Sequence, residues 1–206
     1  MTGMTCPALR HSSPSVYSTH RDPVPSCVSP SMSRSLGNTI GDSLAQSLNY
    51  SRRMLVGVTP DQFARFARPG GQLVESNHAA FVYGHLSLYA SRIIEQIDAE
   101  VSFLTPTAQF QTVFSKDAKC VDDPTGEIYP AMDDIVEAYF KGYEAALAVL
   151  REAPDSALQK PNPSGGRMTE LFPTLGSIQA FYVGGHIMMH LGQVSAWRRM
   201  LGLGAA

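Results

Sequence analysis

Residues 174–202 read TLGSIQAFYVGGHIMMHLGQVSAWRRMLG, and this stretch decides the fold class. Its apolar residues recur at the spacing of one face of a helix. They are Leu175, Ile178, Tyr182, Met189, Ala196 and Met200. Gly202 follows as a plausible C-cap, and Arg198 and Arg199 lie near the negative end of the helix dipole. The pattern predicts one long helix over about 174–201.

Three earlier stretches have the same helical periodicity. They predict amphipathic helices over about 36–57, 75–99 and 131–153. No stretch alternates steadily between polar and apolar residues, as a half-buried strand would. Four long helices joined by long connections predict an all-α fold, specifically a four-helix bundle with crossover connections.

The connections between these helices differ in character. Thr59-Pro60-Asp61-Gln62 forms a capping box with Pro at the first helical position, so a short helix is expected from Pro60 until the Arg68-Pro69-Gly70-Gly71 breaker. Residues 104–130 and 154–173 have no clean period and contain several Pro and Gly residues. Residues 104–130 are long for an ordinary loop, which indicates a crossover, a lid or part of a site.

Composition narrows the classes of protein to consider. The chain has 206 residues, of which 44% are hydrophobic, enough for one domain with an extension. A formal charge of −2 supplies no basic excess for nucleic acid, and no apolar run reaches the roughly 18 residues of a membrane helix. Cys6, Cys27 and Cys120 show neither CxxC spacing nor an even number, so reduced thiols in the cytoplasm are expected.

The N-terminal segment differs from the rest. Residues 1–34 are rich in Ser and Pro and contain a single acidic residue, Asp22. Such a composition cannot bury enough apolar surface to offset the entropy of ordering. We therefore predict a disordered tail over 1–34 and a helical domain over 35–206.

Three histidines on two predicted helices indicate a metal site. His186 and His190 stand four residues apart, so both imidazoles face the same side of one helix. His85, on another helix, also lies on an apolar face, where an unpaired imidazole would be costly. The alternative is that each is a core residue satisfied by a neighbouring polar group. For three histidines at these positions we favour a divalent ion with an open coordination position: zinc, nickel or iron(II).

Two further residues are candidates to support this site. His78 lies seven residues before His85, on nearly the same helix face. It would orient a ligand or serve only as a helix-start residue after Asn77, and we favour the orienting role. Gln193 follows His190 by three residues and could orient a ligand through a hydrogen bond. The alternative for Gln193 is a buried amide bonded to the neighbouring helix.

The segment 184–202 resembles the last helix of the DinB-like superfamily, which carries H-x3-H-x-G-Q followed by an apolar and basic tail. Tyr83-Gly84-His85-Leu86 is similar to that family's second-helix histidine, which Leu usually follows. The resemblance covers about residues 36–203. It implies a crossover four-helix bundle, metal ligation by His85, His186 and His190, and a homodimer. It also implies zinc or nickel as the metal.

The resemblance leaves the activity open between two main hypotheses. Some DinB-like proteins are transferases or isomerases that activate a low-molecular-weight thiol on the metal, so a small thiol and an electrophilic substrate are the expected partners. The alternative is a non-catalytic metal-binding or stress-response bundle. A third hypothesis is that the helical bundle is an interaction module that binds no metal. Candidate pocket residues for the first hypothesis are Tyr83, Tyr89, Tyr182, Arg92 and Lys141.

Overall fold

The computed structural model describes residues 34–97 and 107–206. Most of these residues are helical, and within the two ranges no β-strand forms. Two isolated bridges, Ala67–Val74 and Pro161–Thr174, are the extended pairings recorded there. The all-α prediction is confirmed. The predicted disordered tail falls outside the described residues, apart from Arg34.

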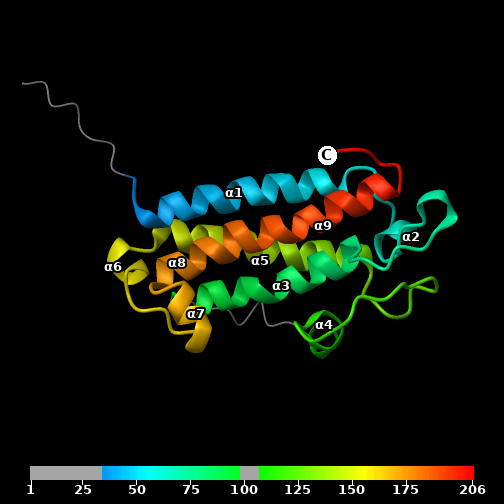
Figure 1. The fold of residues 1–206 in the computed structure, drawn as a ribbon. Helices are drawn as coiled ribbons and strands as arrows, with labels where there is room; N and C mark the ends of the chain where they lie inside the picture. Colours follow the sequence, from blue (N-terminus) through cyan, green and yellow to red (C-terminus); the bar gives the residue numbers. More distant parts are fainter. Residues whose placement is uncertain (1–33, 98–106) are drawn as a thin grey trace, which may run out of the picture. The chain divides into compact units, whose positions relative to one another are not determined.

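Four long helical rods make up most of the described residues. They run side by side (Figure 1). Three are the single helices α1 (Leu36–Leu55), α3 (Ala79–Glu95) and α5 (Met132–Glu152). The fourth is a continuous rod of three segments: α8 (Leu175–Ala180), η3 (Phe181–His186) and α9 (Ile187–Met200). Both α1 and α3 pack against α5, and both also pack against α9. Each of the two therefore lies between the same pair of neighbours.

Most of the apolar faces predicted from the sequence form the core between these rods, but the face predicted for the second half of the last rod is wrong. Met189 is 57% exposed and Ala196 is also exposed, whereas Leu191, Val194 and Trp197 are buried. The π-helical segment η3 precedes α9, and such a segment shifts the register of the residues that follow it.

Large side chains from every rod are fully buried, among them Leu44, Tyr83, Tyr143 and Trp197. Burying each such side chain stabilises the fold by about 1.5–3 kcal/mol. Gly37 allows α1 to approach α5 closely, because a Cβ there would collide with the carbonyl oxygen of Leu150.

The helix boundaries follow from their capping residues. Ser35 caps α1, its Oγ accepting the N–H of Asn38 at 3.1 Å. Helix α3 begins at Ala79, four residues after its predicted start, because His78 acts as the N-cap. At the far end of the last rod, Arg198 is buried and donates to the carbonyls of Met54 and Val56, which ties α9 to the end of α1.

The connections contain more helix than the sequence predicted. The short helix α2 (Pro60–Phe63) starts at the predicted capping box, but it ends well before the Arg68–Gly71 breaker. A 3₁₀ turn, η1 (Pro69–Gly71), occupies the breaker itself. Three short helices lie in the two stretches that lacked a clean period. They are α4 (Ala108–Phe114), α6 (Asp155–Leu158) and α7 (Gly166–Leu171). These helices are too short to produce a detectable helical periodicity, because four to seven residues span at most two turns.

Across the described residues, no helix combines the length and apolar character needed to cross a bilayer.

Candidate metal centre

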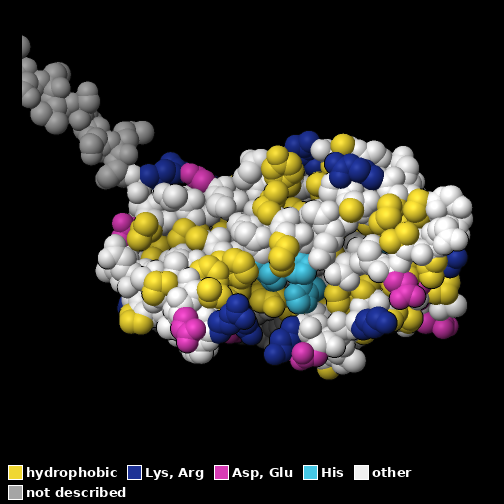
Figure 2. Space-filling model, in the orientation of Figure 1, with side chains coloured by type: hydrophobic (Ala, Val, Ile, Leu, Met, Phe, Trp, Pro, Cys, Tyr) yellow, Lys and Arg dark blue, Asp and Glu magenta, His cyan; other side chains and the backbone are white. Residues whose placement is uncertain are grey.

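His85, His186 and His190 lie together between α3 and the last rod. Each offers one ring nitrogen to a group whose atoms all lie within 4.8 Å of one another. His85 and His186 are 8% and 7% exposed, and His190 is partly buried. Figure 2 shows histidine side chains together at the molecular surface, bordered by hydrophobic ones. The three residues that the sequence grouped as ligands are therefore neighbours in space and reachable from solvent.

A backbone carbonyl fixes the tautomer of His85. Its Nδ1 lies 2.8 Å from the carbonyl oxygen of Phe114, which can only accept, so Nδ1 carries the hydrogen. The lone pair is then on Nε2, which is free to bind a metal. Gly84 makes this contact possible, because a Cβ at that position would collide with the Phe114 ring. The glycine beside His85 therefore lets the α4 segment lie directly against α3.

A side-chain amide fixes the tautomer of His190. Its Nδ1 lies 3.1 Å from Oε1 of Gln193, and the same oxygen accepts a hydrogen bond from Nδ2 of Asn77 at 3.0 Å. With Oε1 as the acceptor, Nδ1 of His190 must donate, so Nε2 again holds the lone pair. Gln193 thus makes a hydrogen bond that would orient His190, and it also bonds to the segment before the neighbouring helix α3. Asn77, which precedes α3, adds a link between the two helices.

His186 ends a π-helical segment, η3, which interrupts the predicted continuous helix. Such π-bulges shift the register of the residues that follow and are frequent at functional sites. On the side facing α1, Oγ of Ser47 donates to the carbonyl of Val183 at 2.8 Å. A Cβ at Gly184 would come within 2.9 Å of Ser43 Oγ, so this glycine permits close contact with α1. Helix α1 therefore supports the segment that presents His186.

Burial keeps all three imidazoles neutral. Burial, followed by the charges of His190 and His85, lowers the pKa of His186 to about 3. It also lowers the pKa of His85 and of His190, against the opposing effects of their hydrogen bonds to Phe114 and Gln193. At neutral pH each ring therefore has a lone pair to offer, which is the form that binds metal ions.

The histidines also have aromatic neighbours. The Tyr89 ring lies 4.5 Å from the ring of His186 and 5.3 Å from that of His85, measured between centroids. Phe81 stacks on His85 at 6.2 Å with an interplanar angle of 10°. On the other side, Phe181 lies 5.8 Å from His186. Aromatic packing restricts how far the imidazoles can turn.

The donor set fits a divalent transition metal. Two of the rings have one nitrogen held by an acceptor and the other free, the usual arrangement of metal-binding histidines. Nδ1 of His186 is one of three buried side-chain atoms that have no hydrogen-bond partner among the described residues. A buried polar atom without a partner is costly and rare in native structures. Within residues 34–97 and 107–206, the cluster includes no fourth Cys, Asp, Glu or His.

His78 is not part of this cluster. Its Nδ1 accepts the N–H of Phe81 at 3.2 Å, and its Nε2 lies 2.9 Å from the carbonyl oxygen of Val121. The ring is fully buried and packs edge-on against Tyr129 at 5.1 Å. Both nitrogens are therefore committed to the backbone. These contacts are those of the helix-start role, and none of them supports the ligand-orienting role that the sequence analysis favoured.

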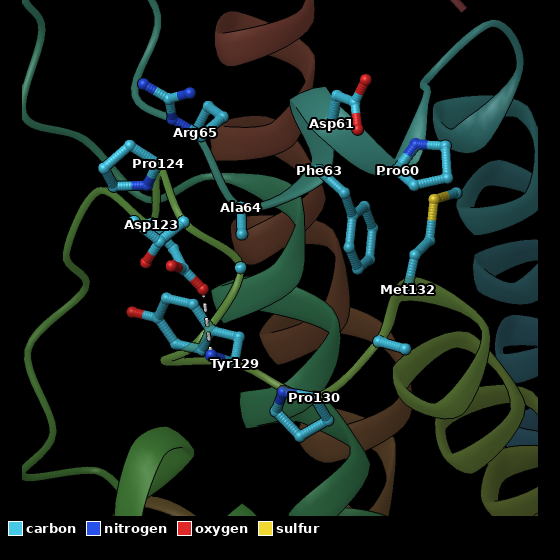
Figure 3. Close-up of a pocket in the computed structure, with 13 residues that line it drawn as sticks. Pro60, Asp61, Phe63, Ala64, Arg65, Asp123, Pro124, Tyr129, Pro130 and Met132 are labelled. Carbon is cyan, nitrogen blue, oxygen red and sulfur yellow. Dashed lines mark hydrogen bonds between the residues drawn. The ribbon is translucent and has the colours of Figure 1, made fainter.

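A separate cavity of about 490 Å³ opens between α2 and the loop before α5 (Figure 3). Its lining residues include Phe63, Arg65, Asp123 and Tyr129. The Asp123 carboxylate accepts the backbone N–H groups of Glu127, Ile128 and Tyr129, so its hydrogen bonds stabilise the loop. No histidine lines this cavity, which is distinct from the candidate metal centre.

The sequence missed three supporting groups: the Phe114 carbonyl, Asn77 and Ser47. A backbone carbonyl has no sequence signature, although Gly84 marked the close approach that brings it to His85. Asn77 stood beside His78, but nothing in its position indicated a contact with Gln193. Ser47 lies on the buried face of α1, 2% exposed, and a polar residue on an apolar face was the available signal.

No protein-family model matches this chain, and a search of curated proteins found no match either.

Proposed function

We propose that the chain is a DinB-like four-helix bundle in which His85, His186 and His190 hold a divalent metal ion, zinc or nickel in preference to iron. The packing of α1, α3, α5 and the last rod supports a four-helix bundle. The H-x3-H-x-G-Q motif that begins at His186 and the segment around His85 support the resemblance to the DinB-like superfamily. The proposal depends most on one observation, that three neutral imidazoles converge within 4.8 Å with two of them already oriented by acceptors.

The function that this site supports best is a thiol-dependent S-transferase or isomerase. A divalent ion held by three imidazoles would keep its full charge and an open position, and it would lower the pKa of a bound thiol. The chain's own residues hold the geometry: the Phe114 carbonyl orients His85, and Gln193 orients His190. Tyr89 and Phe181 pack against the ring of His186. A low-molecular-weight thiol and an electrophilic compound are the proposed substrates.

The alternative function is a non-catalytic metal-binding or stress-response bundle, in which the metal joins α3 to the last rod. The observation that favours this reading is the location of the ligands on two rods that already pack together. A structural site is generally closed by four protein ligands. The described part of the chain supplies three, so the thiol-dependent enzyme is preferred. A cytoplasmic location and homodimerisation belong to the same proposal.

The first test is the metal content of untagged protein compared with His85→Ala and His190→Ala. Near-stoichiometric metal in the parent that is lost in both variants would establish the site. Absence of metal in the parent, with none taken up from added zinc or nickel, would overturn the proposal.

The second test separates the two functions. In the enzyme, adding a small thiol to cobalt-loaded protein should produce a sulfur-to-cobalt charge-transfer band. In the non-catalytic bundle, removing the metal should lower the melting temperature strongly, while no thiol changes the cobalt spectrum.

A further inference from the structure

Arg92 stands next to the candidate metal centre on the same helix as His85. Its guanidinium lies 5.5 Å from the centroid of the Tyr89 ring, and that ring lies 4.5 Å from the ring of His186. Tyr89 therefore bridges the guanidinium and the histidines. Because Arg92 is exposed, a molecule that approaches the histidines from solvent can also reach it.

Arg92 differs from other arginines of the domain in its partners. Arg65 is paired with the Asp122 carboxylate, and Arg52 is paired with Glu144. For Arg92 the contact with Tyr89 is the interaction that the structure records among the described residues. A guanidinium carries five N–H donors and keeps its charge at any pH of interest. The contact with the ring is not a hydrogen bond to an acceptor, so these donors remain available to an anion.

The charge of the surroundings also favours an anion. No carboxylate belongs to the histidine cluster within the described residues. A divalent ion held there would add positive charge that no acidic side chain of this cluster offsets. A ligand with a negative group beside its reactive end would meet both centres, one at the histidines and one at Arg92.

We infer that Arg92 and Tyr89 form a subsite for a carboxylate, so that the site prefers thiols that carry one. This inference rests on the proposed thiol-dependent function and adds the chemical class of the substrate. Arg92 is the specificity-determining residue, since its guanidinium binds the carboxylate. Tyr89 holds the guanidinium beside the histidines.

The test compares matched thiols on cobalt-loaded, full-length protein. The probes are 3-mercaptopropionate against 3-mercaptopropanol and 6-mercaptohexanoate against 6-mercaptohexanol, which differ only in the carboxylate. Binding is read from the sulfur-to-cobalt charge-transfer band, not from turnover. One charge-assisted contact at a partly exposed site should make the better-fitting acidic thiol bind about five- to tenfold more tightly than its alcohol.

Variants identify the origin of that preference. Arg92→Gln should abolish it without weakening the binding of the alcohols, and Arg92→Lys should retain part of it. Arg53 supplies the matched control, because it also lies over a tyrosine ring, that of Tyr50 at 5.2 Å, but on α1. Arg53→Gln should leave the preference unchanged.

The outcomes separate the two levels of the proposal. Charge-transfer bands without a preference for acidic thiols, or a preference that persists in Arg92→Gln, would overturn the carboxylate subsite and leave the thiol-dependent function standing. If no thiol of either kind produces a band, the thiol-dependent function fails and the subsite fails with it.

Discussion

His78 and His85 stand seven residues apart, one capping α3 and the other inside it, yet the structure uses them differently. His78 has both ring nitrogens bonded to the backbone, to the N–H of Phe81 and the carbonyl of Val121. His85 has one nitrogen bonded to the Phe114 carbonyl and the other available toward His186 and His190. Burial does not distinguish the two histidines, because both are buried. What separates the structural histidine from the candidate ligand is whether both ring nitrogens, or only one, are hydrogen-bonded to the backbone.

Removing a candidate ligand should produce the largest effect. His85→Ala should abolish stoichiometric metal binding, a loss greater than the 10–100-fold that removal of an outer hydrogen-bond partner costs. His78→Asn should keep the metal, because Asn can still cap α3 and His78 is not in the cluster. Metal analysis of the two purified variants checks this contrast. Equal metal loss in both would break the distinction between the two histidines.

His78→Ala tests the structural role directly. The variant loses a buried ring and the N-cap of α3, and it leaves the Val121 carbonyl without its donor. These losses should lower the free energy of unfolding by about 3–4 kcal/mol. Urea denaturation followed by circular dichroism measures the change. His78→Asn, which restores the cap, should be clearly more stable than His78→Ala; equal stability would show that the cap contributes little.

Acid should destabilise the fold through His78. Burial is the main cause that lowers the pKa of His78 to about 4, whereas an unfolded histidine titrates near 6.5. Between pH 6.5 and pH 4 the unfolded state binds a proton at this histidine and the folded state does not. The contribution of neutral His78 to the free energy of unfolding is therefore fully present above pH 6.5 and is lost as the pH falls toward 4. The contribution should be about 2 kcal/mol between pH 7 and pH 5.

The measurement compares the pH dependence of urea unfolding in metal-free parent and in His78→Asn. The other buried histidines are common to both proteins, so the difference isolates His78. Identical pH profiles would show that His78 does not titrate as its burial requires.

Gln193→Ala should weaken the metal site without abolishing it. The variant leaves His190 without the acceptor that orients its ring, and metal affinity should fall about 10–100-fold. Competition with a chromophoric chelator gives the affinity. Gln193→Glu keeps an acceptor at this position and should retain most of it. An unchanged affinity in Gln193→Ala would mean that packing against the other rings orients His190.

Much of the fold followed from periodicity, and the candidate ligands followed from spacing. The three histidines came together because two are four residues apart on one helix and the third lies on a helix that packs against it. What the sequence could not show were groups without a side-chain signature, such as the Phe114 carbonyl. It also gave no sign of the π-helical register at Phe181–His186. The single apolar stripe predicted through this segment therefore assigned Met189 and Ala196 to the buried face, and both are exposed.

The smallest predicted effect concerns this π-helical segment. Ser47 donates to the Val183 carbonyl, three residues before His186, so Ser47→Ala removes a hydrogen bond from a buried carbonyl. The cost should be about 1 kcal/mol of stability. If the hydrogen bond also holds the register that presents His186, metal affinity should fall as well.

Ser51→Ala is the matched control, because Ser51 is equally buried on α1 but bonds to Tyr139. It should cost similar stability and leave metal affinity unchanged. Equal metal affinity in the two variants would assign the presentation of His186 to packing alone.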